Sequence, residues 1–141
     1  MKKTYRSKVS YLLLLFIFLL FYLPLIVEAT ETGFHRNLVF SFSLLFVIYA
    51  LVLHLFFFTI YTIEDNQLKI KCGFFTYKPI PISAIKSISK TRSILASPAA
   101  SFDRIEIKYG KWDEIILSPQ NKYEFAKDLC AINPEIQNLM K

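Results

Sequence analysis

The chain has 141 residues, of which 54% are hydrophobic and 16% aromatic, and its formal net charge is +6. The hydrophobic fraction exceeds that of an ordinary soluble protein, and the length leaves room for one small domain besides any membrane segments. The charge does not indicate a nucleic-acid-binding protein, because residues 61–141 hold 12 Lys and Arg against 9 Asp and Glu, spread along the whole segment.

Residues 1–9 form a short basic leader without an acidic residue. Its basic residues are Lys2, Lys3, Arg6 and Lys8. Lys and Arg flank transmembrane helices mainly on the cytoplasmic side. Two apolar runs follow the leader, and the loop between them contains only one Lys or Arg, Arg36. The leader therefore predicts a cytoplasmic N-terminus.

Two uncharged apolar runs follow, at residues 10–27 and 38–60. At 1.5 Å per residue, helices of these lengths would extend roughly 27 Å and 35 Å, against a hydrocarbon core of about 30 Å. Residues 10–60 therefore predict a transmembrane hairpin of two helices, which returns the chain to the cytoplasm. His54 lies in the second run, but neither run holds an Asp, a Glu or a second His for a proton relay. A hydrogen bond to the neighbouring span is the simpler role for His54.

The leader, the first run and Val27-Glu28-Ala29 are also typical of a secretory signal with a cleavage site. The 17 apolar residues from Tyr11 to Val27 exceed the usual ~7 to 15 of such signals, and Glu28 is an unusual neighbour for the cleaved bond. A retained span is therefore favoured. Both alternatives leave residues 61–141 in the cytoplasm.

From Tyr61 the apolar residues alternate with polar ones, as in β-strands with one buried face. The segment YTIEDNQLKIKC predicts a hairpin with its turn at Asp65-Asn66, and residues 74–78 predict a third short strand. The three-residue spacing of Ile82, Ile85 and Ile88 indicates a bulge or a short turn before a fourth strand.

Two more strands are predicted at residues 102–109 and 112–117. Ser118 and Pro119 then predict the start of a helix, with Ser as its cap and Pro at its first position. The apolar stripe of this helix is expected to pack on the sheet. Its members are Tyr123, Phe125, Ala126, Leu129, Cys130 and Ile132, before Asn133-Pro134 ends the helix.

Residues 61–141 contain no His, so a Ser or Cys nucleophile would lack its usual base. Cys72 and Cys130 match no metal-binding spacing and are expected to be reduced, small buried side chains. The whole chain has three Gly residues, too few for a Gly-rich phosphate loop. We therefore expect no enzymatic activity, no metal and no cofactor.

Lys90, Arg92 and Arg104 form the one dense basic cluster, beside the small residues 97–101. Such a cluster predicts a site for an anion or a lipid headgroup, bound by guanidinium, ammonium and backbone N–H groups. The structural alternative, which we favour, is that Asp103 and Glu106 pair with these cations and that Arg104 braces the loop.

The segments YTIEDNQLKIKCG, IPISAIKSI and SPAASFDRIEIKYG, with Ser118-Pro119 and Phe125 after them, resemble the bacterial YyaB-like PH domain family over residues 58–135. The resemblance implies a pleckstrin-homology-like fold, a bent antiparallel sheet capped by a C-terminal helix, usually carried on proteins with membrane spans. The six strands expected from the sequence fall short of the seven usual in such domains, so one strand either lies within residues 91–98 or is missing. The family has no established activity or ligand, and no functional residue is carried over.

The sequence thus predicts a multi-pass protein of the bacterial inner membrane with both termini in the cytoplasm. Its domains are the leader (1–9), the transmembrane hairpin (10–60) and a mainly-β PH-like domain (61–141). The expected function is a binding or scaffold module for an unknown protein partner or anionic lipid, without nucleic acid. The alternative is an accessory component of a transport or sensing system, in which the spans and His54 are the working part.

Overall fold

A computed structural model describes residues 2–93 and 100–140 of the chain. It divides into two compact units, one of residues 10–54 and the other of residues 1–9 together with 55–141. The nine-residue leader thus belongs to the same unit as the C-terminal domain, whereas the sequence predicts a separate leader.

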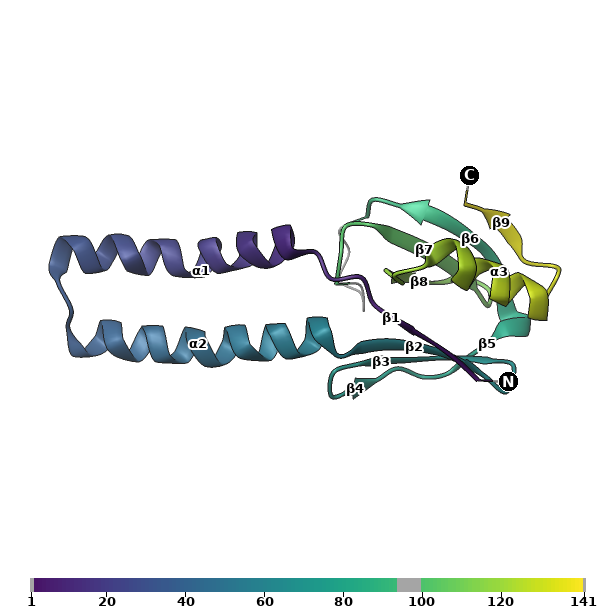
Figure 1. Cartoon of the computed structure of the whole chain (residues 1–141), viewed down its shortest axis with the longest axis horizontal. Helices are drawn as coiled ribbons and strands as arrows, with labels where there is room; N and C mark the ends of the chain where they lie inside the picture. Colours follow the sequence, from purple (N-terminus) through teal and green to yellow (C-terminus); the bar gives the residue numbers. More distant parts are fainter. Residues whose placement is uncertain (1, 94–99, 141) are drawn as a thin grey trace. The chain divides into compact units, whose positions relative to one another are not determined.

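The first unit is a pair of helices, α1 (Tyr11–Thr32) and α2 (Arg36–Phe57), both long and apolar enough to cross a membrane (Figure 1). Both helices extend further into the connecting loop than the apolar runs predict, because residues 28–32 and 36–37 include no helix breaker. Gly33, with φ of +73°, ends α1. The Ser10 side chain accepts a hydrogen bond from the Leu13 N–H (3.4 Å) at its start.

Aromatic side chains join α1 to α2. Tyr22 stacks on Phe18 within α1, with ring centroids 4.5 Å apart, and its ring lies 6.1 Å from that of Phe42 and 6.2 Å from that of Tyr49 in α2. The Tyr49 hydroxyl donates to the Leu14 carbonyl at 3.2 Å. Neither helix contains Gly, so bulky rings rather than a close approach of the backbones hold the pair together.

The second unit contains two β-sheets and a helix. In the first sheet, β1 (Lys3–Arg6), β2 (Thr59–Glu64), β3 (Gln67–Cys72) and β4 (Phe75–Thr76) follow in order, and β5 (Ile80–Pro81) also pairs with β3. The second sheet has the order β8 (Asp113–Leu117), β7 (Arg104–Tyr109), β6 (Ile85–Thr91) and β9 (Gln137–Leu139). Helix α3 (Lys122–Ile132) places Phe125, Ala126 and Leu129 in the common core, at 0% exposure.

The mainly-β, PH-like architecture with a helix near its C-terminus is as the sequence predicts. Asp65 and Asn66 form the β2–β3 turn with φ of 52° and 57°, a left-handed conformation that Asn and Asp tolerate. A short 3-10 helix (Ile82–Ala84) precedes β6, and the β6–β7 register shifts between Ile85 and Ser87. The predicted short turn before the fourth strand is therefore present, and a bulge lies within the strand itself.

The basic leader forms β1, an antiparallel edge strand whose Arg6 lies opposite Ile60 of β2 (Figure 1). Its side chains alternate, with Lys3 and Tyr5 half-buried and Thr4 and Arg6 exposed. The Tyr5 ring meets that of Phe125 edge to face, with centroids 5.2 Å apart. The leader therefore contributes to the core of the domain as well as carrying charge.

Three expectations from the sequence are wrong. Helix α3 begins at Lys122 rather than at Pro119, because Ser118 and Pro119 are buried and pair with the leader: the Lys8 N–H donates to the Ser118 carbonyl at 2.6 Å. Tyr123 and Ile132, assigned to the buried stripe, are 58% and 42% exposed.

The described residues form nine strands rather than six, with β1 and β9 at the ends of the chain and β5 as a two-residue strand. Of residues 91–98, where a hidden strand was considered, 94–98 lie outside the described residues.

A buried hydrogen-bonded cluster of Ser7, Tyr61 and Ser118 joins the leader to the rest of the domain. The Tyr61 hydroxyl donates to Ser7 Oγ at 3.2 Å and accepts from the Ser118 N–H at 3.2 Å. The two Ser hydroxyls are 2.9 Å apart. Burial raises the pKa of Tyr61, so its hydroxyl remains protonated and able to donate.

Removing the Tyr61 hydroxyl should destabilise the domain, because the Ser118 N–H and Ser7 Oγ would lose a partner in the core. We expect Tyr61→Phe to cost about 1–3 kcal/mol of unfolding free energy. In a domain of this size, each kcal/mol corresponds to a midpoint about 4–8 °C lower. Thermal unfolding of the full-length protein in detergent, followed by circular dichroism of the β-sheet, measures this. Tyr77→Phe, at a ring that is 41% exposed, is the matched control, and equal midpoints for the two variants would contradict the prediction.

Candidate functional site

The structure brings Lys90, Arg92 and Arg104 to one hollow of about 410 Å³ in the second sheet. Lys90 lies near the end of β6, Arg92 directly follows that strand, and Arg104 begins β7 opposite Thr91. The antiparallel β6–β7 pairing therefore gathers three cations that the sequence separates by up to 14 positions.

Arg104 braces the chain around this hollow. Its side chain is 9% exposed, its Nε donates to the Ser101 carbonyl at 2.5 Å, and its Nη1 donates to the Ser93 carbonyl at 2.9 Å. A guanidinium that is shared between two carbonyls stabilises the backbone on both sides of residues 94–99. The structural role expected for Arg104 is thus present.

The acidic residues expected to pair with these cations have other partners. Asp103 lies between Lys122 and Lys8, whose Nζ is 3.1 Å from Asp103 Oδ2. Glu106 Oε2 lies 3.8 Å from Lys108 Nζ. The side chain of Lys90 instead lies over the ring of Tyr123, with its Nζ 5.1 Å from the ring centroid. A hydrogen bond from Lys90 lowers the pKa of the Tyr123 hydroxyl.

The anion site at Lys90, Arg92 and Arg104 stays a prediction. Residues 97–99, part of the loop expected to offer it backbone N–H groups, lie outside the described residues. His54, at the centre of the alternative function, is in the last turn of α2. Cys72 and Cys130 are free thiols at half-buried positions, and burial raises the pKa of Cys130. The described residues contain no cluster of three or more His, Cys, Asp or Glu that could hold a metal ion.

A second hollow, of about 520 Å³, lies between the outer edge of β1 and the start of α3. It is lined by Lys3, Thr4, Tyr5, Arg6, Gln120, Asn121 and Glu124. We name it the β1–α3 groove. This groove is not predictable from the sequence pattern, because one of its walls is the leader strand.

Backbone groups of β1 face the β1–α3 groove. Residues of an antiparallel pair alternate between facing their partner and facing away. The Ser7 N–H donates to the Thr59 carbonyl at 3.0 Å, so the backbones of Lys3 and Tyr5 also face β2, and those of Thr4 and Arg6 face outward. The Arg6 carbonyl accepts from the Gln120 N–H at 3.0 Å. Within residues 2–93 and 100–140, no group hydrogen-bonds to the outward N–H and C=O of Thr4.

Two acidic side chains hold the leader against the domain. Asp128 of α3 accepts hydrogen bonds from Lys3 Nζ, at 2.7 Å, and from the Tyr5 hydroxyl. Burial opposes ionisation of Asp128, but the bonds from Lys3 and Tyr5 outweigh it and lower the pKa. Hydrogen bonds from Lys122 and Lys8 similarly lower the pKa of Asp103, against a smaller effect of burial. Burial, together with the bond to Asp128, raises the pKa of Tyr5.

Comparison with known families decides the identity of the domain. Residues 59–133, more than half of the chain, match the model of the bacterial PH domain. The chain belongs to the bacterial PH domain family. The family resemblance seen in the sequence is thereby confirmed. No curated protein and no solved structure matches the chain significantly.

The match begins at Thr59, so β1 lies outside the part of the chain that defines a bacterial PH domain. In this protein the leader adds a strand to the edge of the PH fold. The only sequence pattern that could have predicted this strand is the alternation of Lys3, Tyr5 and Ser7 with Thr4 and Arg6. It was too short and too polar to distinguish a strand from a charged leader.

The ion pair of Asp128 with the leader makes the stability of this PH domain pH-dependent. A carboxyl whose pKa is lower in the folded than in the unfolded state stabilises the fold above its unfolded pKa of about 4, and this stabilisation is lost as pH falls through the folded pKa. We expect the unfolding midpoints of the wild type and Asp128→Asn to differ by a constant amount above about pH 5 and to converge below about pH 4. A difference that grows on acidification would contradict this account.

Proposed function

We propose that this chain is a membrane-anchored PH domain that binds an extended segment of a partner protein, as a scaffold or accessory subunit at the cytoplasmic face of the bacterial inner membrane. The observation that carries the proposal is the outward-facing edge of β1 in the β1–α3 groove. An edge strand with available N–H and C=O groups is a template to which a further strand can add.

The groove has the features that strand addition requires. The N–H and C=O of Thr4 supply main-chain hydrogen bonds, and the flanking polar side chains of Gln120, Asn121 and Glu124 can select among partner sequences. The Gln120 N–H already bonds to the Arg6 carbonyl and so limits the added strand to the N-terminal part of β1. The groove therefore suits a short extended segment.

The two apolar helices support the proposed membrane anchor. Four residues separate β1 from α1, and one residue separates α2 from β2. Because β1 and β2 are paired, the two helices must leave the domain on the same side of any membrane that they cross. The basic leader favours the cytoplasmic side. The proposed work is binding rather than catalysis, since residues 61–141 lack His.

Blocking the edge of β1 tests the proposal. Thr4→Pro removes the outward N–H and places a ring in the groove, while the bonds of Lys3 and Tyr5 to β2 are retained, as edge strands tolerate Pro. Thr4→Val keeps the N–H and is the matched control. We expect proteins that co-purify from native membranes with the wild type and with Thr4→Val to be lost with Thr4→Pro. Equal recovery with both variants, at equal thermal stability, would contradict the proposal.

A further inference from the structure

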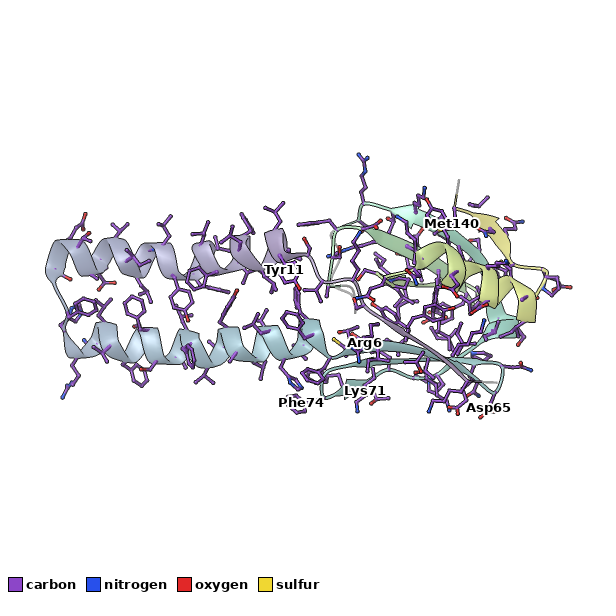
Figure 2. The ribbon with its side chains drawn as sticks, viewed as in Figure 1. Arg6, Tyr11, Asp65, Lys71, Phe74 and Met140 are labelled. Atoms are coloured by element: carbon purple, nitrogen blue, oxygen red, sulfur yellow. The ribbon has the colours of Figure 1, made fainter. Side chains whose placement is uncertain are left out.

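The β3–β4 hairpin ends in a two-residue loop made of Gly73 and Phe74. Cys72 and Phe75 pair directly across it, and Gly73 adopts a φ of +56°, in the left-handed region that favours glycine. In Figure 2, Phe74 lies at one end of the first sheet and Asp65, in the β2–β3 turn, lies at the opposite end. The loop is therefore one pole of the domain.

This pole is covered with exposed aromatic side chains, which we name the aromatic tip. Its members and their exposed fractions are Phe57 (49%), Phe58 (55%), Phe74 (72%), Phe75 (64%) and Tyr77 (41%). Apolar side chains gathered in this way on a small domain mark a surface that contacts a partner or a membrane.

Hydrogen bonds fix the aromatic tip to the end of α2. The Gly73 N–H donates to the Phe58 carbonyl at 3.0 Å. One residue further on, the Thr59 hydroxyl donates to the Leu55 carbonyl in the last turn of α2 at 2.6 Å, and it lies 3.2 Å from Cys72 Sγ. The loop is thus held beside residues 55–59, where α2 ends and β2 begins.

The charges around the aromatic tip suit anionic lipid headgroups. Lys71 and Lys78 flank it and are exposed. No Asp or Glu occurs between Asp65 and Asp103, a stretch that includes β3, β4 and β5. Basic residues close to a bilayer surface are attracted to its anionic lipids.

We infer that the aromatic tip inserts into the interfacial layer of the lipid bilayer, beside the point where α2 leaves it. Aromatic side chains concentrate at the membrane–water interface, where apolar surface is removed from water while polar atoms remain hydrated. The insertion would hold the PH domain at a fixed depth against the membrane. It rests on the membrane anchor of the proposed function, but it is independent of the β1–α3 groove.

Tryptophan reporters in the full-length protein test this inference. The protein is reconstituted into vesicles of phosphatidylcholine with brominated acyl chains, which quench tryptophans that contact the bilayer. Phe74→Trp, combined with Trp112→Phe, reports on the aromatic tip. We expect it to lose most of its fluorescence relative to unbrominated vesicles and to emit at shorter wavelength than a tryptophan in water.

Native Trp112 is the matched negative control. It is 95% exposed and lies in the β7–β8 turn, where the Gly110 N–H bonds to the Ala84 carbonyl. Ile82, two residues before Ala84, donates its N–H to the carbonyl of Asn66 in the β2–β3 turn. The β7–β8 turn therefore lies near the β2–β3 turn, at the pole opposite the aromatic tip. Bromination should leave the fluorescence of Trp112 unchanged. Phe46→Trp, within α2, is the positive control for the anchor, and Phe75→Trp repeats the test at the tip if Phe74→Trp does not fold.

The outcomes separate the inference from the anchor. Quenching at positions 46 and 74, with none at 112, would support the inference. Quenching of a Trp at position 46, with no quenching at position 74 or 112, would overturn the inference and leave the membrane anchor intact. A blue-shifted but unquenched Trp at position 74 would also overturn it, since the tip would then be buried against protein. Absence of quenching at position 46 would overturn the anchor, and with it the inference.

Discussion

The buried contact of Ser7 with Tyr61 and Ser118 is the constraint on which the domain depends. It joins the leader, β2 and the segment before α3, which are separated in sequence by 54 and 57 residues. Because all three polar groups are in the core, each requires the others as hydrogen-bond partners. This contact holds the leader as a strand, and the leader in turn supplies one wall of the β1–α3 groove.

Pairing of the leader with β2 also constrains the membrane topology. The chain leaves the domain through β1, passes through α1 and α2, and returns directly into β2, so the helices form an insertion between two adjacent strands. If α1 and α2 cross a membrane, this pairing requires an even number of crossings, whatever the charge of the loops. Cleavage of a signal peptide near Ala29 would remove β1 and leave Tyr61 and Ser118 without Ser7. The pairing of β1 with β2 therefore depends on residues that lie on both sides of α1 and α2 in the chain.

The interior of the PH fold could be predicted from the sequence, but its ends could not. Alternation identified β2, β3, β7 and β8, because each places apolar residues such as Ile105 and Ile107 on a buried face. The capping pattern at Ser118-Pro119 predicts a helix start that the structure does not have, since Ser118 bonds to Tyr61 and Lys8 rather than to a helix. For the basic cluster, the sequence indicates that Lys90, Arg92 and Arg104 lie together. The ion pairs of Asp103 could not be predicted, because one of its partners is Lys8, a residue 95 positions away.

Disulfide formation between β1 and β2 would test the central claim, that the leader is a strand of the domain, most directly. Thr4 lies opposite Thr62 in a non-hydrogen-bonded pair, for which a Cα–Cα distance of about 4.5 Å allows a disulfide. With Cys72 and Cys130 replaced by Ser, we predict that the pair Thr4→Cys and Thr62→Cys oxidises fully in the full-length protein, as measured by mass spectrometry of the linked peptides. The pair Thr4→Cys and Lys69→Cys, two strands apart, should remain reduced. Absence of the 4–62 disulfide, or equal oxidation of both pairs, would contradict the claim.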